Sequence, residues 1–263
     1  MPIATGLRRV ALGLAALVCA SLLVGCGRGE EGPLRVGAAA SLREPVEQIA
    51  ARFAAANPGV KVEPVFGASS ELAAQLRAGA PLDVLLCADE EIPRALAAEG
   101  RARSARPFAS NRLVVIATPE VAPQLARPVD LAGPSVRRLA MPGPAVPIGH
   151  YAREWLGQRG LVQAIEPLVV QTPDVRTTLS AVDAGNADAA IVYATDARVA
   201  HSARVAFEIP GPEQPRIVYV AAIASDTRQL GVAARFLDFL VGAEAAKLLR
   251  VAGFGSPPEP PSP

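Results

Sequence analysis

The chain has 263 residues, of which 51% are hydrophobic, 19% charged and 4% aromatic, and its formal net charge is +1. This is enough apolar material for a sizeable core, in one large domain or in two small ones. A near-neutral charge without a basic tract excludes the electrostatic signature of a nucleic-acid-binding protein, so we expect no nucleic-acid partner.

The first 25 residues have the pattern of an export signal. Arg8 and Arg9 form a positive start, and the apolar run Val10–Val24 follows them. This run is shorter than the roughly 20 residues that a membrane-spanning helix needs. The pattern therefore predicts a cleaved signal peptide rather than a transmembrane segment.

The end of this segment resembles a bacterial lipobox, since residues 23–26 read Leu-Val-Gly-Cys. We therefore expect residues 1–25 to be a lipoprotein signal peptide, Cys26 to carry the lipid, and residues 26–33 to be a tether. The protein would then be anchored at the periplasmic or extracellular face of a membrane. The alternative is an ordinary signal peptide with an incidental cysteine.

Strands alternate with helices along the rest of the chain, which predicts parallel sheets covered by helices. The expected strands are 34–38, 60–66, 83–87, 112–117, 138–141, 168–171, 189–193, 204–209 and 216–223. The expected helices are 42–56, 71–78, 89–98, 148–158, 175–185, 227–240 and 243–251. Residues 100–111 are expected to be a connection that carries arginine and serine.

Two such runs predict an α/β fold of two doubly wound lobes around a ligand cleft. Lobe 1 is expected to comprise residues 34–112, completed by about 219–255, because the closing helices need a surface to pack on. Lobe 2 would comprise residues 113–218. The proline-rich tail 256–263 is expected to be disordered.

The junction at Ser41 suggests a place for an anion. It follows an apolar strand, and the apolar residues Leu42, Val46, Ile49 and Phe53 come after it at helical spacing. Ser41 is therefore expected at the helix N-cap, where free backbone N–H groups and the hydroxyl face an incoming ligand.

Three more junctions of this kind follow, at Ser69, Ile148 and Val175, and Tyr193 ends a further strand. In open α/β sheets ligands bind beyond the carboxyl ends of the strands. Four helix N-termini that converge there would favour an anion without any cation. Tyr193 would add a phenolic donor, although a tyrosine in this place is also compatible with a purely structural role in the core.

Several short segments, in their order and spacing, resemble the substrate-binding component of the molybdate ABC transporter. The segments that carry the resemblance are 38–42 (AAASL), 66–70 (FGASS), 79–83 (GAPLD), 146–149 (VPIG) with 151–152 (YA), 173–176 (PDVR), and 191–193 (IVY) with 196–197 (DA). The resemblance covers nearly the whole mature chain. It implies the type II periplasmic-binding-protein fold, in which two lobes close on a tetrahedral oxyanion.

The resemblance also implies a set of ligand donors that are all uncharged. They are the hydroxyls and backbone N–H groups of Ser41 and Ser69, the N–H groups of Ile148 and Val175, and the Tyr193 hydroxyl. The loop before Ile148 is one residue shorter than is usual in the family, so Gly149 N–H is an alternative donor. Ala68 stands where many relatives have serine.

The function that the resemblance implies is capture of molybdate, and also of tungstate, for delivery to the permease of an ABC importer. The protein is then a monomer and not an enzyme, and it needs no cofactor and no directly coordinated metal cation. Two alternatives remain. One is a receptor for sulfate, phosphate or a small organic anion, and the other is an exported hydrolase that uses Ser69 or Ser70.

Two further expectations concern charged or ionisable side chains. His150 and His201 are the only histidines, and no acidic cluster lies beside either in the sequence, which argues against a zinc site. Arg176 follows directly after a helix start, where its charge does not help the helix. We expect it to pair with Asp174 or to face solvent.

Overall fold

The computed structural model describes residues 32–258. The expected signal peptide, Cys26 and most of the tether lie outside the described residues, as does the tail from residue 259 onward. Within the described part, no helix is long and apolar enough to cross a membrane.

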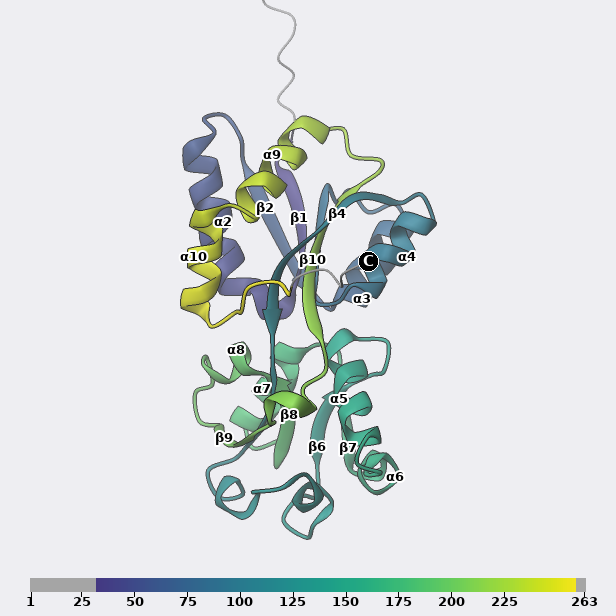
Figure 1. Cartoon of the computed structure of the whole chain (residues 1–263), viewed down its shortest axis with the longest axis vertical. Coiled ribbons are helices and arrows are strands. Elements are labelled where there is room, and N and C mark those ends of the chain that lie inside the picture. The colour runs from purple at the N-terminus through teal and green to yellow at the C-terminus, as the bar shows by residue number, and fades with distance from the viewer. Residues whose placement is uncertain (1–31, 259–263) are drawn as a thin grey trace, which may run out of the picture. The chain divides into compact units, whose positions relative to one another are not determined.

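Ten strands and a set of α-helices follow one another in an alternating order in the described residues (Figure 1). The strands are β1 (Leu34–Ala39), β2 (Val62–Gly67), β3 (Val84–Cys87), β4 (Ala102–Asn111), β5 (Leu113–Ala117), β6 (Leu139–Pro142), β7 (Val169–Thr172), β8 (Ala189–Tyr193), β9 (Arg204–Glu208) and β10 (Ile217–Ala224). The helices are α2 (Arg43–Ala56), α3 (Ser69–Arg77), α4 (Glu91–Ala98), α5 (Pro147–Gly157), α6 (Val162–Ile165), α7 (Val175–Asp183), α8 (Ala194–Ala197), α9 (Leu230–Leu240) and α10 (Ala243–Ala252).

The strands form two sheets of five strands each, in the orders β2-β1-β3-β10-β4 and β7-β6-β8-β5-β9. We call the first sheet with its helices lobe 1 and the second lobe 2. The chain passes from lobe 1 to lobe 2 between β4 and β5, and it returns between β9 and β10. This confirms the predicted α/β fold of two lobes.

The prediction of parallel sheets is confirmed only in part, because both sheets are mixed. In lobe 1, β1 runs parallel to β2 and β3, but β10 runs antiparallel to both β3 and β4. Lobe 2 repeats this mixture, because β6 is parallel to β7 and β8 whereas β5 is antiparallel to β8 and β9. In each lobe the antiparallel pairs include the strand through which the polypeptide enters the lobe and the strand through which it leaves. These strands are β10 and β4 in lobe 1, and β5 and β9 in lobe 2.

The expected connection at 100–111 is also wrong, since it contains β4, the ten-residue edge strand of lobe 1. Its middle is exposed, and its pairing with β10 has two irregularities of register. An edge strand tolerates Pro107 because one side of its backbone needs no ladder partner. The arginines and serine that resemble a loop in the sequence lie on this solvent-facing edge.

Helices cover both faces of the first sheet, with α2, α9 and α10 on one side and α3 and α4 on the other (Figure 1). Phe53 of α2 and Phe236 of α9 meet edge to face, with ring centroids 5.2 Å apart. In lobe 2 the side chain of Trp155 on α5 is fully buried. These cores fix the helix positions, and with them the helix N-termini that face the gap between the lobes.

Candidate functional site

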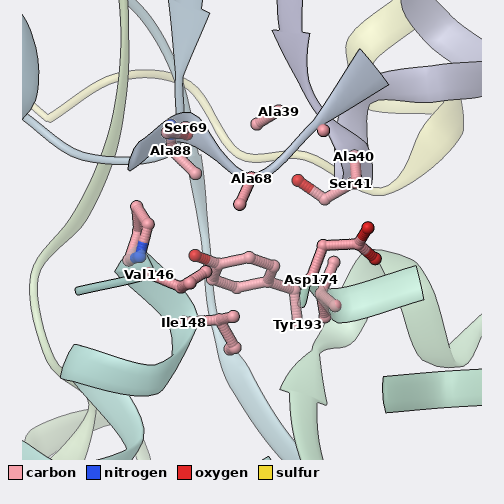
Figure 2. A pocket seen from close by; sticks show the side chains of 13 residues that line it. Ala39, Ala40, Ser41, Ala68, Ser69, Ala88, Val146, Ile148, Asp174 and Tyr193 are labelled. Atoms are coloured by element: carbon pink, nitrogen blue, oxygen red, sulfur yellow. The ribbon is translucent and has the colours of Figure 1, made fainter. Parts of the chain in front are cut away.

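A small hollow lies where the two lobes meet, and all five residues predicted to bind a ligand line it: Ser41, Ser69, Ile148, Val175 and Tyr193. Figure 2 shows the lobe 1 residues along one side of the hollow and the lobe 2 residues along the other. The cavity between these residues has a volume of about 20 Å³. This is far less than the roughly 300–1,000 Å³ of pockets for drug-sized molecules, so the hollow suits a small ion.

Ser41 lies in a 3₁₀ turn, Ala40–Leu42, between β1 and α2. The prediction that it caps α2 is wrong: the residue that precedes α2 is Leu42, and Ser41 makes no capping hydrogen bond. The extra turn keeps Ser41 at the end of β1 while α2 begins further on. Its Oγ lies 2.9 Å from the Tyr219 hydroxyl, and the side chain is 2% exposed.

Ser69 is the first residue of α3, whose N-cap is Ala68. The first helical hydrogen bond of α3 runs from Leu72 N–H to the Ala68 carbonyl, so the N–H groups of the turn before it are left for other acceptors. Ser69 Oγ accepts a hydrogen bond from Ala88 N–H at 3.0 Å. Its own hydroxyl hydrogen is therefore available to a ligand in the hollow.

Lobe 2 contributes the N-terminus of α5. Pro147 occupies its first turn, and the first helical hydrogen bond runs from His150 N–H to the Val146 carbonyl. Ile148 lines the hollow. Gly149 packs instead against the preceding loop, where a Cβ atom would lie only 2.2 Å from the Gly143 carbonyl oxygen. Of the two alternative donors, Ile148 belongs to the lining of the hollow and Gly149 does not.

Val175 begins α7 and follows its N-cap, Asp174. The Asp174 carboxylate accepts from Thr177 N–H at 2.9 Å, and its carbonyl accepts from Thr178 N–H. These bonds hold the first turn of α7 in place and leave Val175 N–H without a helical acceptor. The N-terminus of α7 therefore presents a free amide at the hollow.

Tyr193, the last residue of β8, extends its ring into the hollow from lobe 2 (Figure 2). Its side chain is 1% exposed, and its hydroxyl has no hydrogen-bond partner among the described residues. Burial raises the pKa of Tyr193, so the hydroxyl keeps its proton and can donate it. A buried polar group without a partner is costly, so this hydroxyl has a hydrogen bond to gain from an acceptor that enters the hollow.

The charge pattern also favours binding by dipoles. Within the described lining residues the only charged side chain is Asp174, whose carboxylate is engaged by its own helix. The nearest arginine in sequence, Arg176, forms two hydrogen bonds with Glu44 of α2, at 2.8 and 2.5 Å. The expectation that Arg176 pairs with Asp174 or faces solvent is thus wrong.

Arg176 has a second acidic neighbour, Asp196 of α8, with Nε 2.7 Å from Oδ1. Asp196 is fully buried, and this burial raises its pKa to about 7 against the opposing effect of the Arg176 guanidinium. Because Glu44 belongs to lobe 1 and Asp196 to lobe 2, the Arg176 side chain joins the lobes beside the hollow. These partners are too distant in the sequence for the local pattern to reveal them.

The sequence of this chain matches the family model described as bacterial extracellular solute-binding protein over residues 34–255. The chain belongs to this family. The match spans both lobes and therefore includes every residue of the hollow. Members of the family are solute-binding proteins, which agrees with a protein that is not an enzyme.

Relatives of this chain confirm the resemblance to the substrate-binding component of the molybdate ABC transporter. The molybdate-binding protein ModA of Escherichia coli is 31% identical over 88% of this chain and 92% of its own length. The Bacillus subtilis protein YvgL, provisionally named an ABC transporter substrate-binding lipoprotein, is 27% identical over 94% of this chain and 98% of its own. The solved periplasmic molybdate-binding protein of Azotobacter vinelandii is 27% identical, with a TM-score of 0.74, and covers 86% of this chain and 100% of its own.

Two residues beneath the site were not predicted from the sequence, Tyr219 of β10 and Asn111 at the end of β4. Asn111 Nδ2 lies 3.3 Å from the Tyr219 hydroxyl, which in turn contacts Ser41. The expected strand at 216–223 places Tyr219 in a sheet but does not indicate its neighbours. Among the described residues no group of three His, Cys, Asp or Glu side chains is placed to hold a metal ion.

Proposed function

We propose that the protein binds molybdate, and also tungstate, as a free oxyanion in the hollow between its lobes. The observation that carries the proposal is the buried Tyr193 hydroxyl, which lacks a partner among the described residues and shares the hollow with Ser41, Ser69 and the N-termini of α3, α5 and α7. All of these groups are donors. An acceptor-rich dianion supplies what each of them lacks.

The energetics support a tightly bound dianion without any cation. Hydrogen bonds to a charged group contribute roughly 1.5–3 kcal/mol each. A helix N-terminus adds about 0.3–1 kcal/mol, and up to ~2 kcal/mol where it is partly buried. Neutral donors also avoid the desolvation cost of burying a cation next to the ligand.

Selection among tetrahedral dianions would rest on size. Sulfate has the same shape and charge as molybdate but shorter bonds. In a rigid ring of donors a smaller ion leaves some of them unpaired, at about 1–3 kcal/mol for each buried group. The alternative of a sulfate, phosphate or small organic anion receptor shares the site and differs only in this fit.

The proposal includes delivery of the ion to the permease of an ABC importer by a monomeric protein anchored through a lipid on Cys26. It is supported by the Leu-Val-Gly-Cys segment at 23–26 and by the extracellular solute-binding family to which the chain belongs. The provisional lipoprotein name of YvgL agrees with it. Mass spectrometry of the protein from membranes of the native host would detect the acyl chains, and a soluble protein with an unmodified Cys26 would contradict the anchor.

Isothermal titration calorimetry with molybdate, tungstate, sulfate and phosphate tests the proposed ligand. We expect one molybdate or tungstate per chain, and sulfate and phosphate at least tenfold weaker. Ser41→Ala and Ser69→Ala should each weaken molybdate binding roughly 10- to 100-fold, because each removes a hydrogen bond to a charged ligand. Ser70→Ala is the matched control on the same helix and should leave the affinity unchanged, since Ser70 is not part of the lining.

A melting temperature that rises no more with molybdate than with an equal ionic strength of sodium chloride would contradict the proposal. Tighter binding of sulfate than of molybdate would favour the alternative oxyanion receptor. Labelling of Ser69 by a serine-reactive probe would favour the hydrolase.

A further inference from the structure

Beneath Ser41 lies a chain of buried polar side chains that no direct ligand contact requires. Ser41 Oγ is 2.9 Å from Tyr219 Oη, and Asn111 Nδ2 is 3.3 Å from the same Tyr219 oxygen. Asn111 Nδ2 also donates to Thr195 Oγ1 at 2.9 Å. All four residues are buried, so water cannot freely exchange with these hydrogen bonds.

The direction of each hydrogen bond follows from the two ends of the Asn111 amide. Its Oδ1 accepts from Arg112 N–H at 2.9 Å, which turns Nδ2 toward Tyr219 and Thr195. Nδ2 can only donate, so Tyr219 Oη accepts from it. The phenolic hydrogen of Tyr219 then has Ser41 Oγ as its acceptor.

This order fixes the role of the Ser41 hydroxyl. Since Ser41 Oγ accepts from Tyr219, its own hydrogen is free to point into the hollow. The reverse order would give Tyr219 Oη two incoming hydrogens and leave its own hydrogen without an acceptor in a fully buried place, which is unfavourable. Burial raises the pKa of Tyr219, so it stays protonated and keeps this role as a donor.

These hydrogen-bonded side chains also connect the two lobes at the place where the polypeptide passes between them. Asn111 is the last residue of β4, Tyr219 belongs to β10 of lobe 1, and Thr195 belongs to α8 of lobe 2. Ser69 has a simpler support, since its Oγ accepts from the Ala88 backbone within lobe 1. The two serines are thus held as donors by independent groups.

We propose that Asn111 and Tyr219 are positioning residues that orient the Ser41 hydroxyl as an obligate donor to the bound oxyanion. The proposal rests on the proposed function of the hollow, and it assigns to residues outside the lining a share of the affinity. Neither residue lines the hollow, and each acts only through Ser41.

A double-mutant cycle measured by calorimetry with molybdate tests the proposal. Tyr219→Phe should weaken molybdate binding about tenfold, which corresponds to about 1.4 kcal/mol. In a Ser41→Ala background the same change should have no further effect, because the hydroxyl that Tyr219 orients is gone. In a Ser69→Ala background, the matched control, Tyr219→Phe should again cost about tenfold.

Asn111→Ala is the second variant and should show the same dependence on Ser41, with a smaller loss. Equal losses from Tyr219→Phe in all three backgrounds would show a merely structural role and overturn the proposal. An unchanged affinity of Tyr219→Phe would overturn it as well. If the unmutated protein binds sulfate but not molybdate, the proposed ligand fails, and the same cycle with sulfate still decides the positioning role.

A measurement on the ligand-free protein tests the positioning role of Tyr219 independently of which ion the hollow binds. Neutron diffraction of the ligand-free protein should place the Tyr219 hydroxyl deuterium between Oη and Ser41 Oγ. A Ser41 deuterium on that line, directed at Tyr219, would overturn the proposal whatever the protein binds.

Discussion

At the scale of single residues, Tyr193 separates binding from stability. Its buried hydroxyl lacks a partner among the described residues, so Tyr193→Phe removes an unsatisfied group from the ligand-free protein. We expect the free energy of unfolding without ligand to stay the same or to rise by about 1 kcal/mol. Molybdate affinity should fall roughly 10- to 100-fold, because one charge-assisted hydrogen bond is lost.

Urea unfolding and calorimetry of the same samples check the Tyr193→Phe prediction. Leu156→Ala, a change in the core of lobe 2 away from the lining, is the control for unspecific damage: it should lower stability. If Tyr193→Phe lowers stability but leaves the affinity unchanged, the tyrosine is a core residue and not a ligand donor.

Asp89 gives a prediction for pH. Its Oδ1 accepts from Ile92 N–H at 3.0 Å, and burial raises its pKa to about 6. The folded state therefore holds the proton more tightly than the unfolded state, and the stability that this gives is lost as pH rises from about 4 to about 6. Relative to Asp89→Asn, which keeps the acceptor, the unmutated protein should lose about 2 kcal/mol over this range and stay level above it.

Free energies of unfolding of both proteins between pH 4 and 8 test the Asp89 prediction. Asp130→Asn is the matched comparison, because hydrogen bonds from Ala126 N–H and Arg127 N–H lower the pKa of Asp130. Relative to that variant, the unmutated protein should instead lose stability as pH falls below about 4, so this comparison is extended down to about pH 2. If the two stability differences change with pH in the same direction, the raised pKa of Asp89 is contradicted.

At the scale of elements, the helix N-termini around the hollow were predictable because their signals are local. An apolar strand, a short polar junction and apolar residues at helical spacing suffice to place a helix start at Val175, and within two residues of Ser69, where the expected helix 71–78 begins in the structure. The edge strand β4 was not predictable, since its exposed middle has no alternating pattern and its partner β10 is far away in the chain.

Contacts between residues far apart in the chain were also not predictable at the site. The five predicted site residues follow from local junctions and from the family resemblance, and the structure brings them together. Ser41 contacts a tyrosine 178 positions away, and Arg176 contacts a glutamate 132 positions away. Such pairs depend on how β10 and α2 pack in the folded chain, and no sequence period encodes them.

The ion pair between α2 and α7 joins elements of different lobes and should slow the release of the ligand. Glu44→Gln breaks the paired hydrogen bonds with Arg176, so we expect molybdate to dissociate about threefold faster. The loss of one negative charge should act mainly on the association rate of molybdate, whereas the loss of the ion pair should act on its release rate. Measuring both rates therefore separates these two effects.

Stopped-flow measurements of molybdate release at low and high salt check this expectation for Glu44. The control is Glu47→Gln on the same helix, whose partner Arg43 lies on α2 itself at 3.8 Å. This control should release the ion at the rate of the unmutated protein. Equal release rates for all three proteins at low salt would show that the ion pair between the lobes does not contribute to retention.

At the scale of the whole molecule, the two sheets are alike in their mixture of strand directions, and each lobe supplies helix N-termini to the same hollow. A ligand that needs donors from both lobes stabilises their contact, because one lobe alone supplies only part of its hydrogen bonds. The proposed ligand is thus a dianion that is held by amides and hydroxyls, without a cation.

A crystal structure of the protein with molybdate, located by the anomalous signal of molybdenum, tests this claim most directly. We predict one molybdate in the hollow, with its oxygens within hydrogen-bond distance of the Ser41, Ser69 and Tyr193 hydroxyls and of the Ile148 and Val175 N–H groups. A molybdenum position outside the hollow, or an arginine or lysine side chain in direct contact with the bound ion, would contradict the account.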